Sequence, residues 1–143
     1  MIRHMEKRDY IMEQIKQLGR VLGMILAGIL KLKERGKYSE IHRYVENEMK
    51  DQLDLNFHHL ADLSDDQFIN TMIRERKLSL EGVETLAEIF LELGEIQESD
   101  DLKYKYLKRA LFIYEFLSEN SETYSLSWTY KIKYIKDLMN PDV

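Results

Sequence analysis

The sequence contains no cysteine, which excludes disulfides, thiol nucleophiles and thiolate metal sites. That absence fits a reducing compartment, so we expect a cytoplasmic protein. Proline occurs once, at Pro141, and glycine six times in 143 residues, so long irregular loops are not expected. The longest apolar run, residues 21–30, is about half of what a membrane span needs. We therefore expect no membrane association.

Recognisable catalytic motifs are missing as well. The chain has no glycine-rich phosphate loop, no Gly-x-Ser-x-Gly elbow and no His-Glu-x-x-His pair. We therefore expect no enzyme, no catalytic residue, no bound metal and no cofactor. The formal net charge of −5 disfavours nucleic acid as a partner, because binding a phosphate backbone requires a basic face.

Helix-forming residues dominate what is present. A hydrophobic share of 44% is enough to build a core, so we expect one folded all-α domain spanning residues 1–143. The spacing of apolar residues predicts helices near 9–35, 38–52, 65–75, 79–94, 101–117 and 123–139, with a helical turn in 53–63. Ser64 and Gln67 have the spacing of a capping box, and Ser79 has the position of an N-cap.

Two segments have the pattern of a helical repeat. Residues 32–38 (LKERGKY) combine a helix end, a glycine turn and a tyrosine that opens the next helix, and residues 93–94 with 106–114 are similar. This pattern resembles tetratricopeptide repeats, whose paired helices pack through a glycine turn and a late small residue. Gly36, Tyr38 and Ala110 match it. The resemblance implies antiparallel helical hairpins in a right-handed array or bundle of five to seven helices.

The sequence also departs from that repeat. Ile41 and Glu48 stand where small residues are usual, and the stretch from Gly94 to Ala110 is about a turn too long. The whole chain is also similar to small bacterial helical proteins with no assigned function. A repeat array needs about three units for a continuous core, so two units must close on themselves or dimerise.

The first predicted helix has apolar residues on too many sides. One seam alternates in steps of four and three: Ile11, Ile15, Leu18, Leu22, Ile25, Ile29 and Leu32. A second stripe of small residues, turned about a right angle from the seam, suggests close backbone approach. Either other helices cover both stripes, or a two-fold homodimer does, and we favour the homodimer. Its expected interface is Leu18, Gly19, Leu22, Gly23, Leu26 and Ala27.

Aromatic residues crowd the last two predicted helices. Nine of the fifteen aromatics lie there, more than two inner stripes can bury. Tyr130 and Tyr134 alternate with lysines, a combination that suits a groove for a peptide or another protein. The leading prediction is a non-catalytic interaction or scaffold module, although edge packing of the rings remains an alternative. Its expected contact residues are Tyr106, Tyr114, Tyr124, Trp128, Tyr130 and Tyr134.

A rival prediction uses the histidines. His42 and Glu46 are four residues apart, and Asp62 lies one helical turn after both His58 and His59. An imidazole and a carboxylate at that spacing can bind the same metal ion on one helix face. The rival is therefore a small-molecule or metal-binding regulatory protein that uses residues 42–62. Adjacent histidines diverge on a helix, so only one of them can join Asp62.

A carboxylate stripe completes the pattern. One face of the predicted helix 79–94 carries Glu81, Glu84, Glu88, Glu92 and Glu95. Like charges at this spacing destabilise a helix, so neighbouring cations should offset them. The expected source is the next helix or a basic partner, and the candidates in the next helix are Lys103, Lys105, Lys108 and Arg109.

Overall fold

The structure, a computed structural model, describes residues 2–123 and 125–140, with side chains from residue 7 onward. These residues form helices and turns and no strand, which confirms the expected all-α fold of five to seven helices. The elements are α1 (Ile2–Glu34), the 3-10 turn η1 (Tyr38–Glu40), α2 (Ile41–Leu53), α3 (Phe57–Asp62), α4 (Asp65–Ile69), the π-helical segment η2 (Asn70–Glu75), α5 (Leu80–Ile96), α6 (Asp100–Asn120) and α7 (Leu126–Met139).

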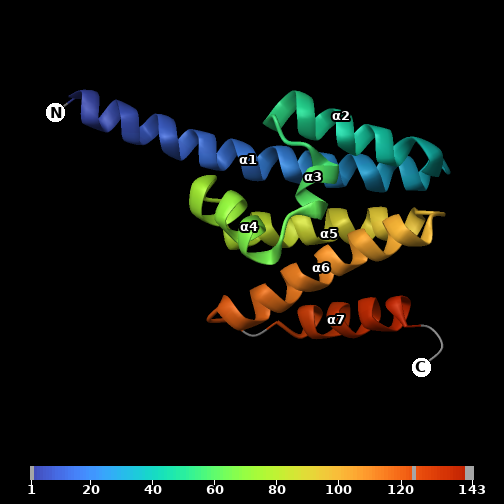
Figure 1. The fold of residues 1–143 in the computed structure, drawn as a ribbon. Helices are drawn as coiled ribbons and strands as arrows, with labels where there is room; N and C mark the ends of the chain where they lie inside the picture. Colours follow the sequence, from blue (N-terminus) through green and yellow to red (C-terminus); the bar gives the residue numbers. More distant parts are fainter. Residues whose placement is uncertain (1, 124, 141–143) are drawn as a thin grey trace.

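The long helices pack as a series of neighbours. α2 runs back along α1, α5 packs against α1, α6 runs back along α5, and α7 packs against α6 (Figure 1). α1, α5 and α7 therefore run in one direction, and α2 and α6 run in the other. The short helix α3 bridges α2 to α6. The N-terminal part of α1 projects beyond the rest of the described structure (Figure 1).

α5 lies at the centre of the core. Most of its circumference is buried, including Val83, Leu86 and Phe90. Phe57 of α3 stacks on Phe90 with a ring-centroid distance of 4.6 Å, and it lies 5.2 Å from the ring of Tyr106 on α6. Offset and tilted ring pairs of this kind add to the apolar burial itself. This aromatic cluster joins the middle of the chain to the α5–α6 pair.

The expected helix signals are confirmed, while several boundaries differ. Ser64 and Gln67 form a capping box, Ser79 caps the amide of Gly82, and Gly36 takes a φ of +71° after α1. α1 starts at residue 2, seven residues before the expected start, because most residues of this stretch, such as arginine, methionine, glutamate and lysine, are good helix formers. The expected helix 65–75 becomes π-helical after residue 69, and the last helix begins at 126.

The residues expected at a dimer interface on α1 differ in their exposure to solvent. Leu18 and Leu22 are core residues, 6% and 0% exposed, so they cannot contact a second chain, and their assignment to an interface is wrong. The helices of the same protomer cover their face of the seam, as α1 packs on α2 and α5. Leu26 is partly buried, whereas Gly23 and Ala27 are exposed and Gly19 is intermediate.

Close backbone approach occurs at different glycines from those expected. A Cβ added at Gly19 or Gly23 would meet nothing within 4 Å. A Cβ added at Gly94 would lie 2.8 Å from Leu107 Cδ2 and 3.2 Å from the Leu107 backbone nitrogen. A Cβ added at Gly28 would collide with the Tyr44 side chain of α2. Close helix contacts therefore require glycine at Gly28, where α1 meets α2, and at Gly94, where α5 crosses α6.

We predict opposite effects for one substitution at two helical glycines. Gly23→Ala should raise the free energy of unfolding by about 0.5–1 kcal/mol, because alanine favours helix and the site is open. Gly94→Ala should lower it by about 1–3 kcal/mol through overpacking against Leu107. Urea unfolding followed by circular dichroism measures both. A destabilised Gly23→Ala, or a neutral Gly94→Ala, would contradict the packing described.

Candidate partner-binding groove

A row of half-buried glutamates follows the side of α5 that faces α1 and α7. Glu84, Glu88, Glu92 and Glu95 all have intermediate exposure, whereas Glu81 in the first turn is exposed. We call these four residues the carboxylate row. Half-buried carboxylates need hydrogen-bond donors, since an unmatched charge away from water is costly. The neighbouring helices supply those donors on both sides.

α1 supplies a cation to this row. Lys33 Nζ donates to Glu92 Oε2 at 2.6 Å, with both side chains largely buried. The bond to Glu92 raises the pKa of Lys33 above its ordinary value, and Glu95 contributes in the same direction. The ammonium therefore stays charged and joins the end of α1 to α5.

α7 supplies two neutral donors. Trp128 Nε1 donates to Glu84 Oε2 at 2.8 Å, and the Tyr134 hydroxyl donates to Glu95 Oε2 at 3.0 Å. Burial, followed by that bond to Glu95, raises the pKa of Tyr134. These two bonds join the ends of the row to α7, and they lie about three helical turns apart on α5 and fewer than two turns apart on α7. They fix the position of α7 across α5.

Beside the bond between Tyr134 and Glu95, α5 and α7 line an open groove of about 560 Å³. From α7 it is lined at residues 126, 127, 130, 131 and 134, which fall on one helix face. Leu91, Glu92 and Glu95 line it from α5. Its rim carries large exposed apolar groups, with Tyr130 65% and Leu126 54% exposed. The groove therefore combines an apolar surface with carboxylates.

Negative charge predominates in this region. Burial raises the pKa of Glu88, the ammonium of Lys131 partly offsets this, and Glu84 and Glu92 raise the pKa further. Four carboxylates of the row are accompanied by two nearby lysines, Lys33 and Lys131. The row therefore has two more carboxylates than ammonium groups, and within the groove lining Glu92 and Glu95 accompany Lys131.

A buried phenol lies behind the row. Tyr114 is 1% exposed, and its hydroxyl has no hydrogen-bond partner among the described residues. Burial raises the pKa of Tyr114, and Glu88, Glu84 and Glu92 raise it further. Its hydroxyl therefore lies close to the centre of the row as an unused donor and acceptor.

The expected aromatic contact residues are thus divided between core and surface. Tyr106 and Tyr114 are 0% and 1% exposed, so their assignment to a partner surface is wrong. Both lie on the inner face of α6, where α5 covers them. Trp128 is partly buried against Glu84, and Tyr130 and Tyr134 are exposed at the groove. Tyr124 lies outside the described residues.

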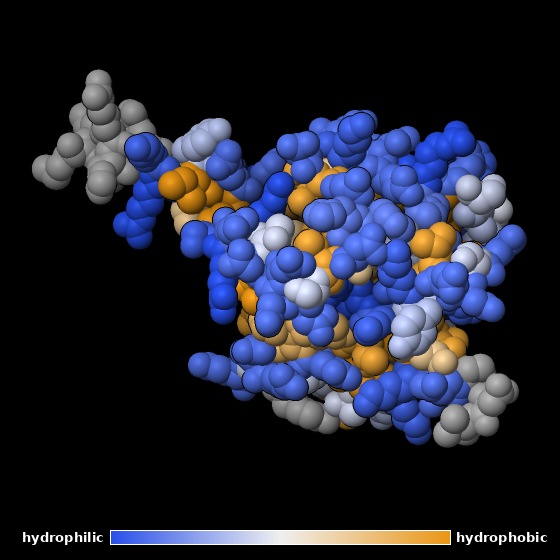
Figure 2. All heavy atoms as spheres, viewed as in Figure 1, coloured by the Kyte–Doolittle hydropathy of each residue, from blue (hydrophilic) through white to orange (hydrophobic). Residues whose placement is uncertain are grey.

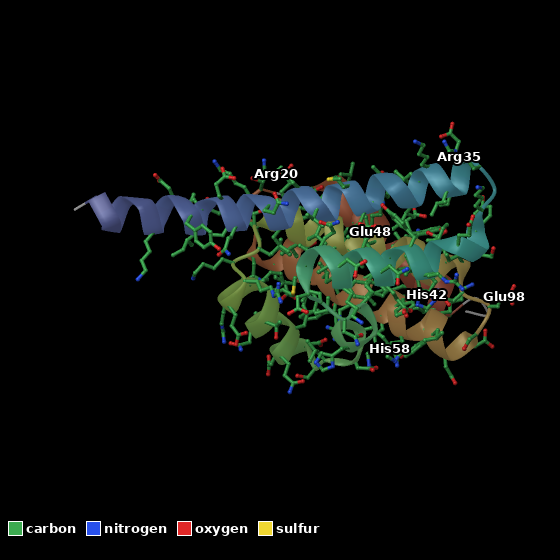
Figure 3. The ribbon with its side chains drawn as sticks, turned by 90° about the horizontal axis from the view of Figure 1, so that it is seen from above. Arg20, Arg35, His42, Glu48, His58 and Glu98 are labelled. Atoms are coloured by element: carbon green, nitrogen blue, oxygen red, sulfur yellow. The ribbon has the colours of Figure 1, made fainter. Side chains whose placement is uncertain are left out.

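The histidines do not converge on a common site. His42 Nε2 lies 3.0 Å from Tyr106 Oη and 2.7 Å from Glu46 Oε1 on α2. His58 lies on α3, apart from His42 (Figure 3), and contacts Asp62, which Lys105 also binds at 2.6 Å. Among the described residues, no three histidines or carboxylates are placed to hold a metal ion.

Sequence reasoning found the carboxylate row and not its partners. Of the cations expected from α6, Lys105 binds Asp62 and Arg109 binds Asp65. At 100° per residue, Gly94 lies about 120° from Glu88 around α5. Gly94 lies on the side of α5 that meets α6. Its angular distance from Glu88 therefore indicates that the carboxylate row does not face α6.

Comparison with known proteins adds no relative: the chain matches no protein-family model, no curated protein and no solved structure. Within the described residues, none of the helices has the length and apolarity to span a membrane. The interpretation of the groove therefore rests on its geometry and charge.

Glu88 gives the row a testable pH dependence. Its pKa in the folded state is raised above 4.5, so stability should fall as pH rises from about 4.5 through the folded-state value. Glu88→Gln removes the cost of ionising this group, and we expect the variant to be more stable than wild type at pH 7. The gain should vanish below pH 4.5, where Glu88 is protonated in both states.

Urea titrations at pH 4 and pH 7 measure this difference. Glu81→Gln is the matched control, because Glu81 is exposed on the same helix, and it should bring no stabilisation. A Glu88→Gln variant that is less stable at pH 7, or equally stabilised at both pH values, would show that Glu88 is not desolvated.

Proposed function

We propose that this protein is a non-catalytic interaction module whose α5–α7 groove binds a cationic segment of a protein partner. One observation carries the proposal: two exposed tyrosines, Tyr130 and Tyr134, line the same groove as two glutamates of the row, Glu92 and Glu95. Arginine and lysine side chains combine an apolar stem with a charged end, so they suit a surface of this composition.

Glu95 is the best placed acceptor for such a cation. Its Oε2 accepts a bond from the neutral Tyr134 hydroxyl, and no ion pair to Glu95 occurs among the described side chains. Glu92, in contrast, already binds Lys33. A guanidinium beside Glu95 can also lie over the rings of Tyr130 and Tyr134, where cation–π attraction adds to the charge pairing.

The row suits binding better than acid–base chemistry. Glu84, Glu92 and Glu95 each accept a bond that fixes the carboxylate in place. Glu88 has a raised pKa, but it lies beside Lys131 on a helix surface, and no metal-binding cluster accompanies it among the described residues. The histidine-based regulator is the weaker proposal, because its ligands are dispersed.

Three further parts of the proposal come from the sequence. α1 and α2 pack as an antiparallel pair, and so do α5 and α6. A relationship to tetratricopeptide repeats is therefore part of the proposal. Cytoplasmic location rests on the absence of cysteine. Self-association as a homodimer is the third part, and it is independent of the groove.

The chain's single tryptophan provides the assay for the groove. Trp128 bonds to Glu84 at one end of the row, so its fluorescence should change when a cation binds. We expect a capped pentapeptide with a central arginine-leucine-arginine sequence to bind saturably. Glu95→Gln and Tyr130→Ala should each weaken binding by about tenfold, which corresponds to roughly 1.4 kcal/mol.

Two controls accompany this assay: a tyrosine substitution outside the groove and a peptide of opposite charge. Tyr104→Ala removes another exposed tyrosine, on α6, and should leave the affinity unchanged. A glutamate-leucine-glutamate peptide should not bind. Equal affinity of both peptides, or an unchanged affinity in both groove variants, would refute the proposed function.

A further inference from the structure

The projecting part of α1 exposes the start of the apolar seam. Ile11 is 48% and Met12 49% exposed, and Ile15 is only partly buried. From Leu18 onward the same seam is buried in the protomer. Figure 2 shows this apolar surface on the projecting helix, flanked by hydrophilic residues. The apolar seam therefore extends toward the N-terminus beyond the part of α1 that the other helices of the protomer bury.

A notch opens where this helix leaves the body. Its volume is about 550 Å³, and residues 11, 14, 15, 17 and 18 of α1 line one side. The end of α2 and the end of η2 line the other side, with the carboxylates Asp51, Asp54 and Glu75 and the cations Arg76 and Lys77. Arg76, also in the lining, donates to the Leu53 carbonyl and is thereby engaged. The C-terminal end of α2 adds the negative end of a helix dipole.

We propose that a second copy of this chain fills the notch, with the projecting α1 segments pairing antiparallel about a two-fold axis. The pairing rests on the self-association proposed above and assigns it a surface. Both halves of the interface occur on one chain, as an isologous contact requires. Each copy contributes an apolar segment that carries Lys7 and Arg8, and a notch in which three carboxylates outnumber two cations.

The register follows from the spacing of residues on α1. An axis near Ile11 and Met12 places Arg8 of one copy opposite Ile15 of the other, at the notch. At 100° per residue, Lys7 and Arg8 lie on either side of the seam that contains Ile11. Both cations are exposed, so they are free to reach the notch carboxylates of the other copy. Complementary charge would fix the register, and the seam would supply apolar burial.

One substitution separates this surface from the rest of α1. Ile11→Asp places a carboxylate in the proposed seam and should raise the dimer dissociation constant by at least about tenfold. Met24→Asp is the matched control, because Met24 is 70% exposed on the opposite side of the same helix. It should leave the dissociation constant unchanged. Sedimentation equilibrium measures both, and circular dichroism verifies the fold.

A charge exchange tests the register directly. Reversing the tip with Lys7→Glu and Arg8→Glu should weaken the dimer, as should reversing the notch with Asp51→Lys and Glu75→Lys. The chain with all four changes should recover the wild-type dissociation constant within about threefold, because the pairs are restored with opposite sign. Failure of the four-fold variant to recover would overturn the register.

The outcomes distinguish the surface from self-association in general. A wild-type dimer that Ile11→Asp leaves intact would overturn the α1 pairing while keeping self-association. A wild-type monomer at 100-micromolar concentration, roughly the upper end of cellular protein levels, would overturn both and leave the notch to a different protein. These substitutions should leave the affinity for the arginine peptide, measured by Trp128 fluorescence, unchanged. The proposed function of the groove is therefore tested independently of the dimer.

Discussion

The arrangement of the long helices depends on satisfying the carboxylates of α5. This helix is buried around most of its circumference, and its remaining side carries Glu84, Glu88, Glu92 and Glu95 half out of water. Carboxylates left without donors there would cost more than the burial of one side chain gains. α1 and α7 lie where their donors reach the row, through Lys33 on one side and Trp128 and Tyr134 on the other. The groove results from that requirement, because α7 meets α5 through long polar side chains.

The sequence predicts what depends on neighbours along the chain. The capping box, the N-cap serine, the glycine that ends α1 and the existence of each long helix follow from local chemistry and periodicity. Periodicity also identifies the carboxylate row as one face. It cannot say which helix that face meets, so it points to the cations of α6 or to a basic partner, whereas the cation that binds the row is Lys33 of α1.

The same limit explains the site residues. Tyr106 and Tyr114 share their helix with exposed Tyr104, and only packing against α5 decides which rings are buried. Leu18 and Leu22 belong to a seam that the sequence leaves open to a second helix or a second chain. Glycines in a helix indicate close approach equally well at each position, although here the close contacts are at Gly28 and Gly94 and the sites at 19 and 23 are open. Surface residues such as Tyr130 and Tyr134 were easier to place, since their spacing from buried Ile135 sets their direction.

The two candidate surfaces are chemically complementary to cations and lie on different helices. The groove offers carboxylates of α5 beside tyrosine rings of α7, and the notch offers carboxylates at the ends of α2 and η2 beside the apolar seam of α1. Cation binding in the groove is tested by intermolecular nuclear Overhauser effects between the side-chain δ protons of the arginine peptide and the protein. We expect cross-peaks to the ring protons of Tyr130 and Tyr134. Cross-peaks confined to other surfaces, including the notch at Asp51, would contradict it.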